Sequence, residues 1–366
     1  MSAAAAYYPL PCHSTDITAQ TQAIDQSQVA NAGDNSVIIQ IQQAVQAQKA
    51  DVASTAAAGG RHMSDTYDQQ DSVAQSQDLN QVQFANSGDN SVVIQNQNAV
   101  QSQFGNLDSS DGHGWATGNS IDQAQDLNQF QFANASDNSI NQNAVQNQQA
   151  NVGGGRHMHD ANTVAQAQDL NQLQFADAGD NSAIIQNQDA PQSQFANIHD
   201  FGGHGYGHTG YPDSMITQAQ DLTQLQFANA GDNAIIVQNQ DAFQSQFANL
   251  FGGRHTSDAD VIAQAQNLDQ FQFANAGDHS AVLQNQDALQ SQFALTNVDP
   301  HGYAASGGAG HAGGSDWLAT FDFTHQVQDL NQVQFASAAG GDGGASAMHA
   351  SVMPDVTEPL VTMSLF

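Results

Sequence analysis

Polar and apolar residues alternate with a period of two along most of the chain. In QNQDAFQSQFAN (238–249) every glutamine falls on one parity, whereas Phe243 and Phe247 fall on the other. Successive side chains of a β-strand point to opposite faces, so a period of two predicts strands. Runs of β-branched residues such as NAIIVQ (233–238) support the same prediction.

These runs follow a short turn signal, GDN. Gly and Asn tolerate a positive φ and an aspartate side chain bonds its own backbone, so GDN favours a tight turn between two strands. One segment is ambiguous. VAQAQDLNQLQFA (164–176) places Val164, Ala167, Leu170 and Leu173 at steps of three, and Ala, Gln and Leu are good helix formers. We favour a strand here because the rest of the unit reads as strands, and a helix is the alternative.

The turn belongs to a longer internal repeat, QFANAGDNS. Its anchor aspartates are Asp34, Asp89, Asp137, Asp180, Asp232 and Asp278, at steps of 55, 48, 43, 52 and 46 residues. A constant anchor at variable spacing predicts one structural unit joined by loops of different length. The loops are rich in Gly and His, as in GGRHMSD (59–65) and GGHGYGHTGYPD (202–213).

These repeats predict a domain organisation. We expect a loose N-terminal segment (1–20), six tandem units (21–299), a Gly/His-rich linker (300–324), a decayed seventh repeat (325–344) and a C-terminal tail (345–366). The tail is apolar with few acids and loosely resembles an uncleaved secretion signal.

Stacked units of this kind predict an all-β fold, a repeat-built β-solenoid whose strand–turn–strand rungs hydrogen-bond at about 4.8 Å. QFAN recurs 20 residues after Phe175 and Phe227. If each unit makes two rungs, the anchor aspartates are about 10 Å apart, but the sequence leaves the number of rungs per unit open. Equal positions then stack, and Gln and Asn side chains form amide ladders. The ladder residues expected in two well-preserved units are Gln174, Phe175, Asn181, Gln186, Gln226, Phe227, Asn233, Gln238 and Phe247.

Charge narrows the possible partners. The chain carries 36 acids against four Lys+Arg, a formal net charge of −32. Nucleic acids and anionic membrane surfaces are bound through basic residues, so neither is an expected partner. Glu358 is the only glutamate. An acid content made almost wholly of aspartate, a turn residue, fits a turn-rich β-protein.

Candidate metal sites are of two kinds. The six anchor aspartates could bind calcium, which prefers oxygen ligands, but neither an EF-hand loop nor a GGxGxDx run is present, so we favour a plain turn role. The loop histidines His62, His157, His159, His204, His208 and His255 could bind Zn or Cu. We favour solvated linker residues, because Gly-rich loops preorganise a site poorly. No cofactor is expected.

An enzyme is not expected either, since the sequence has no nucleophile elbow, metalloprotease helix, phosphate loop or CxxC pair. Cys12 is the only cysteine, which excludes an intramolecular disulfide. The N-terminus MSAAAAYYPLP lacks the basic and continuous apolar regions of a Sec signal. No apolar run reaches the ~18 residues of a transmembrane helix.

The repeat resembles that of curlins, the subunits of bacterial functional amyloid fibres. The matching positions are Leu170, Asn171, Gln174, Phe175, Gly179, Asn181, Ala183 and Gln186. The turn here is about two residues longer than in curlins, and Asn181 and Gln186 are one residue closer. The resemblance implies an exported, extracellular or cell-surface β-solenoid that associates with itself into fibres for adhesion and biofilm matrix, with surface or matrix components as further partners. The alternatives are a monomeric solenoid scaffold, stabilised by calcium, that binds surfaces or carbohydrate, and a disordered Gln/Asn-rich chain.

Overall fold

The computed structural model describes residues 13–55, 68–110, 116–153, 160–199, 214–252, 261–298 and 323–338. These residues form thirteen long β-strands, and none of them lies in a helix. The strands are β1 (His13–Asn31), β2 (Val37–Thr55), β3 (Asp68–Asn86), β4 (Val92–Ser110), β5 (Ala116–Asn134), β6 (Asp137–Gly153), β7 (Asp160–Ala178), β8 (Ala183–His199), β9 (Met215–Ala230), β10 (Ile235–Gly252), β11 (Val261–Ala276), β12 (Ala281–Val298) and β13 (Phe323–Ala338).

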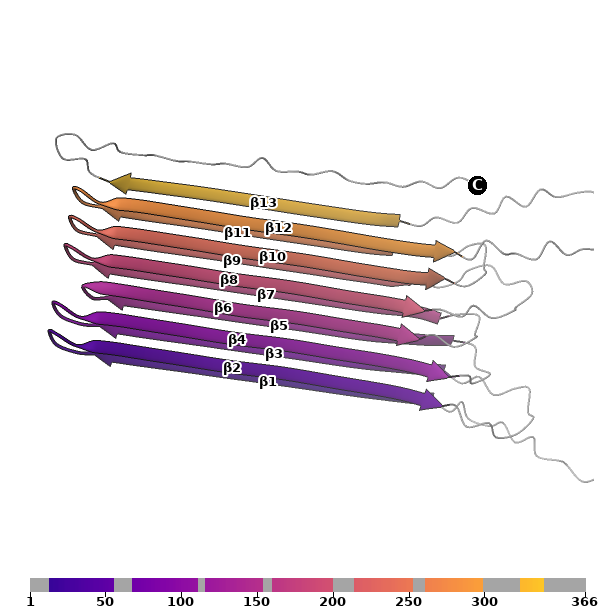
Figure 1. Ribbon diagram of the computed structural model, residues 1–366. Coiled ribbons are helices and arrows are strands. Elements are labelled where there is room, and N and C mark those ends of the chain that lie inside the picture. The colour runs from indigo at the N-terminus through magenta and orange to yellow at the C-terminus, as the bar shows by residue number, and fades with distance from the viewer. Residues whose placement is uncertain are drawn as a thin grey trace, which may run out of the picture.

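The strands form two parallel sheets that face each other (Figure 1). The odd-numbered strands make a seven-stranded sheet in chain order, β1 to β13, and the even-numbered strands make a six-stranded sheet, β2 to β12. Every pairing is parallel, and equal repeat positions are paired. This arrangement confirms the all-β, repeat-built solenoid. The Gly/His-rich loops between units lie outside the described residues.

Each repeat unit forms one rung, so the two-rung arrangement that the sequence left open does not occur. Phe175 of β7 pairs with Phe227 of β9, one full unit later, whereas Phe195 lies in β8, in the opposite sheet. The physical reason is that only GDN carries turn chemistry. The second QFAN of a unit has no Gly or Asn-Gly signal before it, so the strand continues through it. Anchor aspartates of successive units with equal turns, such as Asp180 and Asp232, are therefore one strand spacing apart, about 4.8 Å.

The structure also differs from the sequence-based expectations in two segments. Residues 164–176 lie in β7, so the helical alternative for them is wrong. Their hydrogen bonds go to the flanking strands β5 and β9, which pair with β7 along almost its whole length. At the N-terminus, β1 begins at His13, inside the segment 1–20 expected to be loose. The C-terminal tail lies outside the described residues.

The interior of the solenoid is built largely of glutamine. In β9 the buried parity carries Ile216, Leu222 and Ala228, with Gln218, Gln220, Gln224 and Gln226 between them. The phenylalanines lie on the outer face, where Phe243 is 41% exposed. The alternation thus places amides inside and aromatic rings outside, which is the reverse of a typical soluble sheet.

Apolar residues fill the spaces between the glutamine rows. They form three clusters, near the GDN turns, at the middle of the strands and near the loop end. In the middle cluster the leucines come from odd strands and the alanines from even strands, as with Leu222 and Ala242. A large side chain facing a small one keeps the two sheets at constant separation. Burying each leucine stabilises the fold by about 1.5–3 kcal/mol.

Candidate functional site: the glutamine ladders and the open ends

Most interior glutamines that lie between two rungs use both of their amide hydrogens; in one row Ile140 of β6 stands between Gln95 and Gln186, and the buried Gln95 Oε1 has no hydrogen-bond partner. Gln226 Nε2 donates along the axis to Gln174 Oε1 at 3.0 Å and across the interior to the Asn239 carbonyl at 2.9 Å. Its own Oε1 accepts from Gln272 Nε2 at 3.0 Å. The side chain is completely buried. Burying an amide without partners costs several kcal/mol, so these three bonds are what allow glutamine to form a core.

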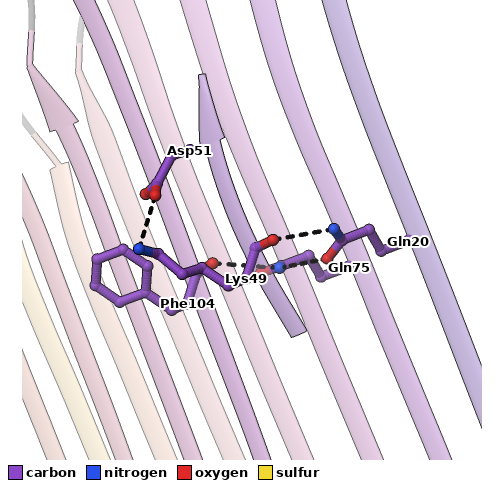
Figure 2. A network of polar contacts seen from close by, with 5 residues as sticks. All are labelled: Gln20, Lys49, Asp51, Gln75 and Phe104. Carbon is purple, nitrogen blue, oxygen red and sulfur yellow. Dashed lines mark hydrogen bonds and ion pairs between the residues drawn. The ribbon is translucent and has the colours of Figure 1, made fainter. Parts of the chain in front are cut away.

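The axial bonds all run in one direction. In each row the glutamine of the later rung donates to the glutamine of the earlier rung, as Gln75 does to Gln20 at 3.0 Å and Gln238 does to Gln186 at 2.8 Å. Figure 2 shows the first of these bonds, together with the bonds from Gln75 to the Phe104 carbonyl and from Gln20 to the Lys49 carbonyl. Each row is therefore a polar chain of amides.

This direction makes the two ends of the solenoid chemically different. No described strand precedes β1, so its glutamines have an N–H without an axial acceptor; they are Gln20, Gln22, Gln26 and Gln28. No described strand follows β12 in its sheet, so its glutamine Oε1 atoms have no axial donor; they belong to Gln284, Gln286, Gln290 and Gln292. One end offers donors and the other offers acceptors.

The expected ladder residues occupy three kinds of position. Gln174 and Gln226 form one axial bond, and Gln186 and Gln238 form another. Phe175 stacks on Phe227 with ring centroids 4.9 Å apart, and Phe247 stacks on Phe195 at 5.0 Å. Asn181 and Asn233 lie in the turns with φ of 55° and 56°. Their backbone N–H groups donate to the carbonyls of the next anchor aspartates, Asp232 and Asp278.

The anchor aspartates bond the backbone of the following rung. Asp34 Oδ1 accepts from the N–H of Asp89 at 3.0 Å, and Asp180 Oδ1 accepts from the N–H of Asp232 at 2.9 Å. Asp232 does the same for Asp278 at 2.7 Å. A carboxylate that accepts a backbone N–H holds the turn of the next rung in register.

The third unit departs from this pattern because its turn is shorter. Its anchor, Asp137, is the first residue of β6, and its Oδ1 accepts from the N–H of Ala183. Among the residues that the structure describes, no three His, Cys, Asp or Glu side chains converge as metal ligands. The candidate histidines His62, His157, His159, His204, His208 and His255 lie outside the described residues.

A second row of acids runs along the outer face of the seven-stranded sheet. Asp126, Asp169 and Asp221 occupy equal positions of β5, β7 and β9. Partial burial raises the pKa of all three carboxyls. Repulsion from aspartates of the row raises the pKa of Asp126 and Asp169 further, and repulsion from Asp269, a diagonal neighbour in β11, does so for Asp221. In β11 the same position is Asn267, which donates to Asp221 Oδ1 at 3.2 Å.

This row predicts that mild acid stabilises the protein. A carboxyl whose pKa is raised in the folded state binds protons more tightly when folded, so its stabilising contribution is full below the unfolded pKa and is lost as the pH rises through the folded pKa. We expect Asp169→Asn to raise the free energy of unfolding at pH 7 by up to about 1 kcal/mol. This is the order of the repulsion energy between two like charges about 4.8 Å apart in water. Thermal unfolding at pH 7 and at about pH 4.5 measures this effect. A wild-type midpoint that does not rise at the lower pH, or a variant equally destabilised at both, contradicts the prediction.

Sequence reasoning did not predict which parity faces inward. The signal was present, because Gln238 and Gln240 share parity with Ile236 and Ala242, whereas the phenylalanines share parity with Asn239 and Asp241. Sequence reasoning also did not predict the contacts of Lys49. It replaces the outer-face phenylalanine in β2, where its Nζ lies 5.4 Å from the Phe104 ring centroid and 2.8 Å from Asp51 (Figure 2).

Comparison of the chain with models of protein families, with curated proteins and with solved structures finds no match. The described residues contain no helix long and apolar enough to cross a membrane. The functional interpretation therefore rests on the geometry of the ladders and of the two ends.

Proposed function

We propose that the chain is a non-enzymatic structural subunit that is exported and assembles end to end into an extracellular fibre or matrix for adhesion. The observation that carries this proposal is the chemical complementarity of the two ends. The first rung offers glutamine N–H donors and the last rung offers glutamine Oε1 acceptors, in rows with the same spacing. Both ends also present open strand edges, which pair readily with further strands.

Acidity and aromatic stacking support the same function. A net charge of −32 keeps the sides of separate copies apart. Some outer phenylalanines stack along the axis with nearly parallel rings, as Phe273 and Phe335 do at 5.1 Å and 4°, and others are tilted, as Phe227 and Phe273 are at 5.9 Å and 48°. A ring at the end of a row has a neighbour on one side only, and it gains a second neighbour when another copy is added.

The test begins with chain dissolved in denaturant and diluted into buffer. We expect fibres that bind thioflavin T and give the 4.8 Å reflection of stacked strands. Calcium is added in a parallel sample. A stable β-sheet signal without fibres would contradict assembly and support a monomeric scaffold. A β-sheet signal that appears only with calcium would show that the anchor aspartates bind calcium.

A matched pair of variants tests the role of the ends. Gln22→Glu places a carboxylate, which cannot donate, at the donor end, where the side chain is exposed. We expect fibre elongation to be about tenfold slower, which corresponds to a loss of roughly 1.4 kcal/mol in the free energy of association. Gln149→Glu adds the same charge at an exposed outer position in β6, far from both ends, and is expected to elongate normally. Equal rates for the two variants would contradict assembly through the ends.

A further inference from the structure

Odd and even strands make the same set of hydrogen bonds across the interior. Positions are counted from the residue at the centre of each strand, which is Leu222 in β9 and Ala242 in β10. The glutamines of β9 at positions −4, −2, +2 and +4 donate to the backbone carbonyls of β10 at positions +5, +3, −1 and −3, respectively. These carbonyls belong to Phe247, Ser245, Asp241 and Asn239. Glutamines of β10 at the same four offsets donate to β11 at the same four offsets from Leu268; the acceptors are the carbonyls of Phe273, Phe271, Asn267 and Ala265.

This equivalence defines an internal screw axis. An odd-strand glutamine such as Gln224 donates within its own rung, whereas an even-strand glutamine such as Gln240 donates to the following rung. Each even strand therefore lies between two odd strands along the axis. A half-turn about the axis, combined with a rise of half a strand spacing, about 2.4 Å, carries each strand onto the next one in the chain.

The number of strands then decides how two copies can meet. The described chain begins with β1 in the seven-stranded sheet and ends with β13 in the same sheet, so the next free place lies beyond β12 in the six-stranded sheet. A copy added without rotation would set its β1 beside β13 and its β2 two spacings from β12. That contact leaves one strand missing from the six-stranded sheet, with an unpaired strand edge on either side of the gap.

We propose that successive copies are related by a half-turn about the solenoid axis, with β1 of the added copy pairing with β12 and its β2 pairing with β13. The proposal rests on the end-to-end assembly proposed above and specifies its geometry. Each strand then runs parallel to its new neighbour, both sheets continue without a gap, and each copy advances the fibre by about 31 Å, thirteen half-spacings.

The residues brought together at this junction are compatible. The glutamines of the added β1 fall in register with those of β12; the pairs are Gln20 with Gln284, Gln22 with Gln286, Gln26 with Gln290 and Gln28 with Gln292. Because the axial bonds keep their direction under a rotation about the axis, each N–H of β1 meets a free Oε1 of β12. At the centre of the strands, Ile24 of the added copy follows the alanines that end at Ala288, and Ala44 follows the leucines that end at Leu330, so the large and small residues exchange sheets at the junction.

The outer faces also match. In the second pairing Lys49 of the added copy falls beside Phe335, extending to the junction the cation–aromatic contact that Lys49 makes with Phe104 inside one copy. The last acids of the outer rows, Asp287 and Asp329, fall beside Ala23 and Gln43 of the added copy. Among the described residues no two carboxylates are directly paired across the junction, and Asp25 is the diagonal neighbour of Asp287, as Asp269 is of Asp221 inside one copy.

The occupant of the free place is a second copy rather than the chain's own C-terminal residues. Residues 345–366 contain no glutamine, so they cannot continue the four amide rows. They also contain Pro354 and Pro359, which lack the N–H that an interior strand needs. The first strand of another copy supplies the complete pattern of four glutamines.

Disulfide trapping between two single-cysteine chains tests the geometry. In a Cys12→Ser background, fibres are grown from a mixture of Phe335→Cys chain and Lys49→Cys chain, and in parallel from Phe335→Cys chain and Val29→Cys chain. Residues on directly paired strands lie within the distance that a disulfide spans. The half-turn predicts covalent dimers in the first mixture and only background dimers in the second, because Val29 meets Phe335 only without rotation.

The outcomes separate the two proposals. Fibres with dimers only in the second mixture overturn the half-turn and leave end-to-end assembly intact. Fibres with dimers in neither mixture also overturn it; repeating the trap with a chain that ends at residue 344 then shows whether the tail occupies the place beyond β12. Absence of fibres in the wild type and in every mixture overturns the proposed function itself.

Discussion

Replacing Gln226 by glutamate is expected to be among the most destabilising single changes that the fold allows. A glutamate has the shape of glutamine but its carboxylate cannot donate, so its oxygens would face Gln174 Oε1 and the Asn239 carbonyl, the two acceptors that Gln226 now satisfies. An unpaired buried charge costs about 3–5 kcal/mol, and each acceptor left without a donor adds about 1–3 kcal/mol. We expect a loss of at least about 4 kcal/mol in the free energy of unfolding at pH 7.

The pH dependence of this loss identifies its cause. Burial raises the pKa of a glutamate above its unfolded value of about 4.3. The penalty is therefore complete above the folded pKa and shrinks as the pH falls through it, since the protonated acid can donate one of the two missing bonds. Urea unfolding of freshly refolded, dilute protein at pH 7 and pH 4 measures both values. A loss that is the same at the two pH values would show that shape, rather than charge, is responsible.

Gln149→Glu is the control for this experiment, because it adds the same charge on an exposed outer position. We expect a change within about 0.5 kcal/mol, as for most surface substitutions. If Gln149→Glu were as harmful as Gln226→Glu, net charge and not the amide ladder would set the stability of the solenoid.

Gly231→Ala is expected to disrupt the stacking of two turns. A Cβ on Gly231 would coincide with Asp180 Oδ1 and would lie 2.9 Å from the Asp180 nitrogen and 3.0 Å from the Gly179 carbonyl carbon. The carboxylate can swing away only by releasing the N–H of Asp232, and the backbone contacts require the turn itself to shift. Together these changes are expected to lower the free energy of unfolding by about 1–3 kcal/mol.

Gly179→Ala is the matched control, at the equal position of the preceding unit. No atom lies within 4 Å of a Cβ there, because the turn of the third unit is shorter and leaves space. We expect this change to be neutral or to stabilise by up to about 1 kcal/mol through the unfolded chain. Urea unfolding of the two variants side by side decides the question. Equal losses would mean that the glycine is needed for its own backbone conformation and not for the approach of the preceding turn.

Much of the fold follows from local patterns that sequence alone carries. The period of two in QNQDAFQSQFAN predicted strands, and GDN predicted the turn in which Asn233 has a positive φ. The repeat predicted that equal residues stack, as Gln226 does on Gln174 and Phe227 does on Phe175. These features are local or repeat with the chain, so a single unit contains the information for all of them.

Three features were decided by the tertiary structure. Whether a unit makes one rung or two depends on whether a strand of about 19 residues finds a partner of equal length, and that partner lies one unit away. Which parity faces inward depends on the opposite sheet, because glutamine becomes a core residue only when a carbonyl across the interior accepts its second N–H. The half-step offset between the sheets appears only when both sheets are present, since one sheet alone has no screw axis. The sequence by itself determined the strands, the turns and the rows of equal residues. The packing of two sheets determined the direction of the axial hydrogen bonds, which side chains face the interior, and the chemical difference between the two ends.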